Sequence, residues 1–211
     1  MSSGSEIPIK QVLGIPNAGP MPHAPNLIVL HHTGVSAEEA IKLFTKSRGK
    51  SSSHYLIKKT GEILQITADD RIANHISSDQ PEKQRSIGIE IENSGHINDQ
   101  YTNAQYNAIK VLLERLEKKH NISHDDTHIK AHYEVDYKRS KDKKWDPSPN
   151  FDWSKIGLPN HPTLKTIMVN AKACQKYYNL WENGCTDKCE KYGMKKGDYA
   201  TGQTCQIIFA H

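Results

Sequence analysis

The chain has 211 residues, of which 36% are hydrophobic and 25% are charged, and its formal net charge is +4. This composition fits a soluble globular protein made of one domain with a small appendage, or of one larger domain. The positive charge is mild and mostly scattered, which argues against nucleic acid as a partner. No apolar run is long enough to span a membrane.

The two ends of the chain differ from its middle. The first ten residues lack the basic and apolar regions of a secretory signal, which predicts a cytoplasmic location, with the cell envelope or non-classical secretion as the alternative. We predict an N-terminal arm over 1–25, a main domain over 26–160 and a small helical region over 161–211. The last region holds all the cysteines: Cys174, Cys185, Cys189 and Cys205. They would form two disulfides or remain free thiols, and a zinc site is the least favoured alternative.

The first predicted elements are strands around one helix. Residues 26–34 form an apolar run closed by Gly34, which is typical of a strand buried on both faces. Ser36 and Glu39 have the spacing of a capping box and predict a helix over about 37–47. Residues 54–58 and 62–67 predict two short strands joined by a turn.

Residues 86–92 alternate strictly, which predicts a strand with isoleucines on one face and Glu90 and Glu92 on the other. Thr102 and Gln105 predict the start of the clearest helix, and residues 127–131 predict a strand leading into His132. A further helix is predicted from 163 to about 180. The fold class is therefore α/β, with a central mixed β-sheet flanked by helices.

Several histidines lie on or just after the predicted strands. One such histidine is more often a core or surface residue, but His31, His32, His54 and His132 form a group on or just after predicted strands. Asp146 lies 14 residues after His132, in a loop that brings a carboxylate near that imidazole. Two imidazoles and one carboxylate hold zinc and leave its fourth position open for water, as catalytic zinc sites do.

Four ordered segments carry a family resemblance: residues 30–33, 53–61, 86–90 and 144–147. Together they resemble the type 2 N-acetylmuramoyl-L-alanine amidases, which share a fold with the peptidoglycan recognition proteins and the T7 lysozyme type of amidase. The resemblance covers roughly residues 25–155. It is stronger to the bacterial recycling and envelope amidases than to the phage branch.

The resemblance implies a role for each of five residues. His31, His132 and Asp146 match the zinc ligands of the family. Glu90 matches the catalytic glutamate, which would exchange protons with the attacking water and the leaving amine. Lys144 matches a lysine that would stabilise the oxyanion formed at the amide carbonyl.

Three further histidines are predicted to support the site. His32 points away from His31 along the strand and would act in support. His75 resembles a family histidine that lines the substrate groove, although Asn74 replaces the usual aromatic residue before it. His54 would lie near the metal or simply pack in the core, whereas Glu92 is expected to form cross-strand salt bridges.

Other departures from the family concern the surroundings of the ligands. Ala131 replaces a common glycine before His132, the segment between His132 and Asp146 is unusually charged, and Ser53 stands where phage members place a tyrosine. The last departure favours the mechanism that depends on the glutamate.

The resemblance implies zinc-dependent hydrolysis of the amide between N-acetylmuramic acid and L-alanine, with peptidoglycan or muropeptide fragments as partners. One alternative is a recognition module that binds such fragments without cutting them. The retained ligand set His31, His132 and Asp146 argues against it. Another alternative is a zinc peptidase that acts on the stem peptide. Oligomeric state leaves no trace in the sequence.

Overall fold

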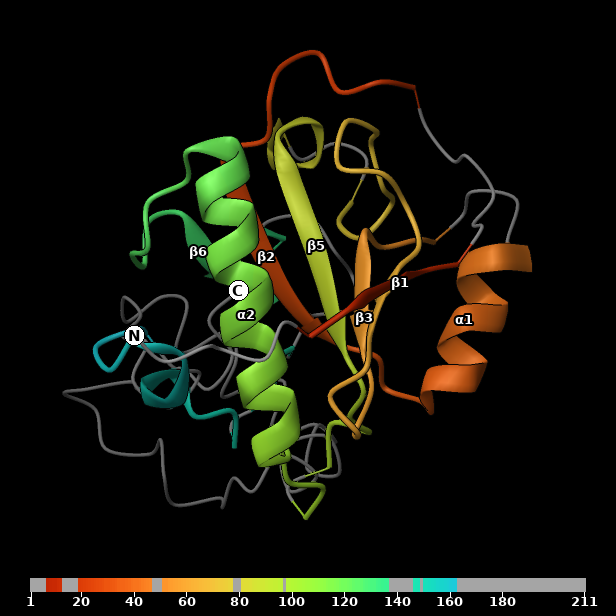
Figure 1. The fold of residues 1–211 in the computed structure, drawn as a ribbon, viewed down its shortest axis with the longest axis vertical. Coiled ribbons are helices and arrows are strands. Elements are labelled where there is room, and N and C mark those ends of the chain that lie inside the picture. Colours follow the sequence, from red (N-terminus) through yellow and green to blue (C-terminus); the bar gives the residue numbers. More distant parts are fainter. Residues whose placement is uncertain are drawn as a thin grey trace, which may run out of the picture.

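The computed structural model describes residues 7–12, 19–46, 51–77, 81–96, 98–136, 146–148 and 150–162. Its strands are β1 (Ile9–Gln11), β2 (Leu27–His32), β3 (Tyr55–Ile57), β4 (Ile63–Gln65), β5 (Ser86–Ile91) and β6 (Ile129–Ala131). The helices are α1 (Ala37–Lys46), α2 (Asn103–His120) and α3 (His132–Val135), with two 3-10 helices, η1 (Pro81–Gln84) and η2 (Trp153–Ile156). Figure 1 shows the sheet with α2 lying across it, which confirms the predicted α/β fold.

The six strands form one mixed sheet in the order β1-β4-β3-β5-β2-β6. β3, β5, β2 and β6 run parallel to one another, and the hairpin partners β3 and β4 are antiparallel. β1, which the sequence did not predict as a strand, pairs in parallel with β4 at the edge. Four neighbouring parallel strands therefore end at the same edge of the sheet.

One face of the sheet is covered by α2. The isoleucines of β5 pack in one cluster with the apolar stripe of this helix, Tyr106, Ile109, Leu112, Leu113 and Leu116. Thr102 caps α2 through a reciprocal pair of bonds with Gln105, so the predicted capping box is confirmed. Since the isoleucines of β5 face α2, its Glu90 lies on the opposite face.

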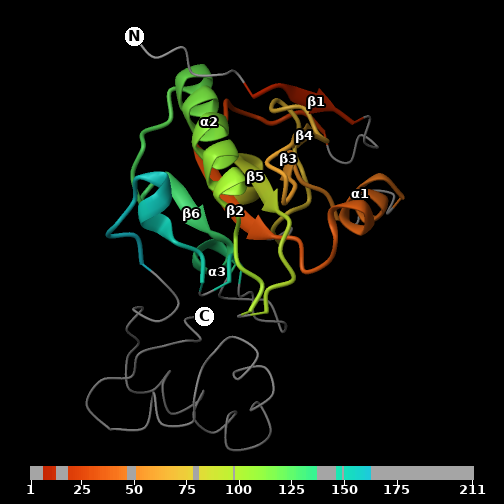
Figure 2. The same ribbon diagram turned by 60° about the horizontal axis from the view of Figure 1, so that its bottom comes forward.

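The opposite face is covered in two parts. α1 packs its Ala37, Ala40 and Phe44 on Leu56, Leu64 and Ile66, and Ser36 with Glu39 caps it as predicted. Nearer β2, Leu27 and Val29 form a smaller apolar cluster with Ile76 and Val135. Figure 2, turned from the first view, shows α3 directly beside β6.

The three predicted regions of the chain remain predictions. The helix expected from residue 163, the four cysteines and most of the C-terminal region lie outside the described residues. Among the helices that the structure describes, none is long and apolar enough to cross a membrane.

Candidate metal centre

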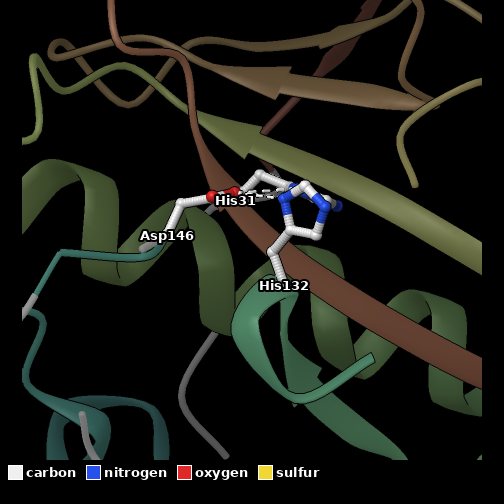
Figure 3. A group of neighbouring side chains, drawn as sticks. All are labelled: His31, His132 and Asp146. Atoms are coloured by element: carbon white, nitrogen blue, oxygen red, sulfur yellow. Dashed lines mark hydrogen bonds and ion pairs between the residues drawn. The ribbon is translucent and has the colours of Figure 1, made fainter. Parts of the chain in front are cut away.

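Three side chains from distant parts of the chain converge at the carboxyl edge of the parallel strands. His31 ends β2, His132 begins α3 directly after β6, and Asp146 lies in the segment before η2. Nδ1 of His31 lies 2.8 Å from Nδ1 of His132 and 2.9 Å from Oδ2 of Asp146. Nδ1 of His132 lies 2.7 Å from the same carboxylate oxygen. Figure 3 shows the three side chains pointing toward one another.

The strand register explains why the two imidazoles meet. Leu30 of β2 pairs with Ala131 of β6, so His31 and His132 occupy the next position on neighbouring parallel strands. The carboxyl edge of parallel strands is where α/β proteins place their ligand sites. Asp146 is brought to the same edge by Ser148, which bonds to the buried Tyr101 just before α2.

A second layer of residues holds the far nitrogen of each imidazole. Nε2 of His31 lies 3.0 Å from Nδ1 of His75, and Nε2 of His75 lies 3.2 Å from Oγ of Ser86. Nε2 of His132 lies 3.3 Å from Oδ2 of Asp136. If each ligand histidine offers the lone pair of Nδ1 to a cation, its Nε2 carries the proton, and both protons have an acceptor in place.

The charges of the group suit a cation. Burial raises the pKa of Asp146, but the imidazoles of His132 and His31 outweigh burial and hold this pKa well below its ordinary value. Burial, together with nearby His31, His54 and His132, lowers the pKa of His75 well below its ordinary value. Asp146 is therefore a carboxylate and His75 a neutral ring at pH 7.

The donor atoms of this site and its burial are suitable for zinc. The donor atoms of His31, His132 and Asp146 all lie within 4.8 Å of one another, and the three side chains are buried. Two imidazole nitrogens and one carboxylate oxygen directed at one point are a set that zinc accepts, with a fourth position left open. The residues present can therefore hold the metal that the sequence implies.

Glu90 lies on the site face of the sheet. It is the register partner of His31 on the neighbouring parallel strand, so both side chains project to the same face. Glu90 is only 9% exposed. A carboxylate beside a metal ligand, on a rigid strand, is well placed for proton transfer.

The other predicted histidines lie at different depths around the centre. His32 projects to the opposite face from His31 and lies against Gly95, where an added Cβ would be 2.7 Å from Cε1 of the ring. His54 is fully buried and bonds to backbone on both sides, accepting from N–H of Gly88 and donating to the carbonyl of Arg71. His75, predicted at the substrate groove, is 6% exposed and lies behind His31.

Two further expectations concern charged residues. The carboxylate of Glu92 accepts from the backbone N–H of Ala37 and of Lys59. It therefore anchors the start of α1 and the β3–β4 turn, whereas the sequence predicted cross-strand salt bridges for it. Lys144, predicted to stabilise the oxyanion, lies outside the described residues.

Sequence reasoning missed Asp136, Ser77 and Ser86. The spacing of His132 and Asp136, four residues apart, would have revealed their contact had the segment been interpreted as helical. Ser77 and Ser86 gave no signal, because each meets its partner only through the fold.

Residues 21–149 match the sequence profile of the N-acetylmuramoyl-L-alanine amidases. The chain is 30% identical over 122 residues to the 1,6-anhydro-N-acetylmuramyl-L-alanine amidase AmpD of Salmonella typhimurium, a match that covers 54% of this chain and 61% of that protein. For AmpD of Citrobacter freundii, the match is 31% identical over 110 residues and covers 50% of this chain and 54% of that protein. The chain thus spans a little over half the length of these curated relatives.

Solved structures agree with the sequence match. A selenomethionine derivative of AmpD superposes with a TM-score of 0.56 at 26% identity and covers 72% of this chain and 93% of its own. The endolysin amidase LysCS of Clostridium intestinale URNW gives the same TM-score and identity, over 72% of this chain and 95% of its own. The fold of this chain is consistent with both.

Proposed function

Since this chain belongs to the N-acetylmuramoyl-L-alanine amidase family, to whose profile residues 21–149 match, we propose that it is a zinc-dependent amidase. Its reaction is hydrolysis of the amide between the lactyl group of N-acetylmuramic acid and L-alanine. The observation that carries the proposal is the convergence of His31, His132 and Asp146 at the carboxyl edge of the sheet, inside the matched region.

The proposed roles divide between the metal and the protein. Zinc in a three-ligand site supplies Lewis-acid chemistry, in which the amide carbonyl is polarised and water is activated. His31, His132 and Asp146 bind and orient the metal, and His75 fixes the imidazole of His31. Glu90 accepts the proton of the attacking water.

The remaining steps complete the hydrolysis. As the carbon–nitrogen bond breaks, Glu90 returns its proton to the departing amine of L-alanine. The lactyl group is left as a carboxylic acid, and transfer of its proton to the amine gives a carboxylate and an ammonium group as products. Lys144 is proposed to stabilise the developing negative charge on the carbonyl oxygen.

Two substrates are consistent with the likeness to known amidases. The name of AmpD specifies anhydro-N-acetylmuramyl peptides, and these soluble fragments are the substrate that we propose first. The equal likeness to an endolysin favours intact peptidoglycan as the second candidate. A cytoplasmic location accompanies the first substrate and a location in the envelope accompanies the second.

Mass spectrometry of digests tests the proposal. The protein is incubated with purified anhydro-muropeptides and, separately, with whole sacculi, with and without a zinc chelator. Peptides that begin with L-alanine, released only without chelator, are the expected product, and the substrate that yields them ranks the two candidates. Cleavage within the stem peptide would indicate a peptidase, and binding without cleavage would indicate a recognition module.

Replacing Glu90 tests the role of the carboxylate. We expect Glu90→Gln to lower kcat by about 10²–10⁴-fold, the usual contribution of a general base, while zinc content stays unchanged. Glu62→Gln is the matched control and should retain full activity, because among the described residues the carboxylate of Glu62 pairs with Lys10 and Lys58 at the surface. Equal activity of both variants would remove Glu90 from the mechanism.

A further inference from the structure

Asp136 is a buried acid directly behind one of the proposed ligands. It follows the last residue of α3 and is 1% exposed. One of its oxygens, Oδ2, accepts three hydrogen bonds, from N–H of Ser77 at 3.0 Å, from Oγ of Ser77 at 2.8 Å and from Nε2 of His132 at 3.3 Å. The acid is therefore oriented toward the imidazole by groups outside its own helix.

Ser77 gives this arrangement its rigidity. It lies 59 residues before Asp136 in the chain and donates both its backbone N–H and its hydroxyl to the same oxygen. Two donors from one residue fix both the position and the direction of the carboxylate. His132 is thus held by an acid that cannot turn away without losing both bonds to Ser77.

We propose that Asp136, clamped by Ser77, is a positioning residue for the metal site. It accepts the Nε2 proton of His132, which directs Nδ1 at the metal position, and its negative charge makes this imidazole a stronger ligand. The inference rests on the proposed function, because it requires zinc at His31, His132 and Asp146.

The two ligand histidines are supported differently. His31 is backed by His75, a neutral ring, and His132 by a carboxylate. Asp136 adds one negative charge in contact with His132. The carboxylate of the ligand set itself is Asp146. The effect of Asp136 therefore falls on metal affinity, through charge as well as through orientation.

Asp136→Asn separates charge from shape, because it keeps the size of the side chain and removes its charge. The zinc dissociation constant is measured by competition with a chromophoric chelator, and the absorption spectrum of the Co²⁺-loaded protein reports ligand geometry. The melting temperature of the metal-free protein checks the fold. Asp69→Asn is the matched control, since Asp69 is 4% exposed and accepts bonds from Tyr55, Lys119 and His120 away from the metal centre.

We expect Asp136→Asn to weaken zinc binding by about 10–100-fold, as replacement of outer-shell partners does, and to alter the Co²⁺ spectrum. Asp69→Asn should lower the melting temperature and leave zinc affinity unchanged. Unchanged zinc affinity in Asp136→Asn would overturn the inference, and so would an equal loss in both variants.

The measurements distinguish failure of this inference from failure of the proposed function. If the wild-type protein cleaves muropeptides and binds zinc but Asp136→Asn binds zinc equally well, the inference fails and the proposed function stands. If the wild-type protein binds no zinc, the proposed function fails first. Should Asp136→Asn not fold, Ser77→Ala replaces it, with weaker zinc binding supporting the inference and unchanged binding overturning it.

Discussion

At the scale of single residues, a line of contacts connects the backbone of β5 to the metal centre. Gly88 lies beneath the ring of His75, His75 accepts from Nε2 of His31, and Nδ1 of His31 faces the other donors. The position of His31 therefore depends on the strand through the buried imidazole of His75. A side chain added at Gly88 should therefore change the affinity of the site for zinc.

Gly88→Ala tests this connection. An added Cβ would lie 2.5 Å from Cγ of His75, so the ring has to move and His31 loses its acceptor. We expect a loss of about 1–3 kcal/mol in the free energy of unfolding, typical of overpacking, together with weaker zinc binding. Urea unfolding and a zinc titration measure the two effects. Gly19→Ala, where nothing lies within 4 Å of the new Cβ, should change neither.

His54 makes a prediction about pH. Burial lowers its pKa from 6.5 to about 4, because the charged ring would lose its hydration. Protonation of Nδ1 would also remove the bond that this atom accepts from N–H of Gly88. The unfolded chain therefore takes up this proton first as pH falls. The stability contributed by neutral His54 is complete above pH 6.5 and is lost between pH 6.5 and 4, by about 3 kcal/mol.

Urea unfolding of the metal-free protein at several pH values measures this loss. The buried His75, whose pKa is also lowered, adds to the slope in the same direction. In His54→Gln the slope between pH 6.5 and 4 should be smaller than in the wild-type protein. An unchanged slope would show that His54 does not titrate in this range.

The sequence was informative about residues with a local landmark. His31 closes an apolar run and Asp146 precedes a proline, so both could be singled out without a structure. Ser77 could not, because its contact with Asp136 joins residues 59 positions apart. The depth of His75 was also beyond prediction, since it depends on the absence of a side chain at Gly88.

At the scale of elements, the start of α2 connects three parts of the fold. Thr102 accepts from N–H of Gln105 and donates to the carbonyl of Lys59 in the β3–β4 turn. Gln105 donates to the carbonyl of Glu92 after β5. The cap therefore fastens the helix to the hairpin and to the end of the central strand.

Thr102→Ala removes the cap and the bond to the turn. We expect a loss of about 1–2 kcal/mol in the free energy of unfolding, the upper part of the range for a helix cap. Thr102→Ser keeps the hydroxyl and should recover most of the loss. Thermal or urea unfolding compares the two variants, and equal stability of both would mean that the methyl group, not the hydroxyl, matters.

Elements with a strong local sequence pattern could be predicted, and elements with a weak pattern could not. β2, β5 and α2 follow from an apolar run, an alternating run and a capped stripe. β1 has three residues, of which two are exposed, and is a strand only because the edge of β4 accepts it. α3 is one turn long, so the sequence predicted only a strand leading into His132.

At the scale of the whole molecule, the metal centre lies outside the main core. His31 and its register partner Glu90 project from the face of the sheet opposite the isoleucines that pack on α2. The sheet and α2 should therefore persist without metal, while the attachment of the Asp146 segment depends on it. Metal removal is expected to reduce stability without unfolding the protein.

Chelation provides the test. After removal of zinc the circular dichroism spectrum at 25 °C should be unchanged. The melting temperature should fall by roughly 5–10 °C, as expected when a ligand present at 100 times its dissociation constant is lost. Calorimetry with and without added zinc measures the shift. Collapse of the spectrum on chelation would show that the metal is part of the core.

The strand order also determines when the centre can exist during synthesis. β2 lies between β5 and β6, and His31 meets Asp146 across 115 positions of the chain. At roughly 5–20 residues per second, a ribosome needs about 6 to 23 s to pass from one to the other. A nascent chain therefore carries its first ligand long before its last. The proposed ligand set is therefore incomplete until nearly the whole matched region has been made.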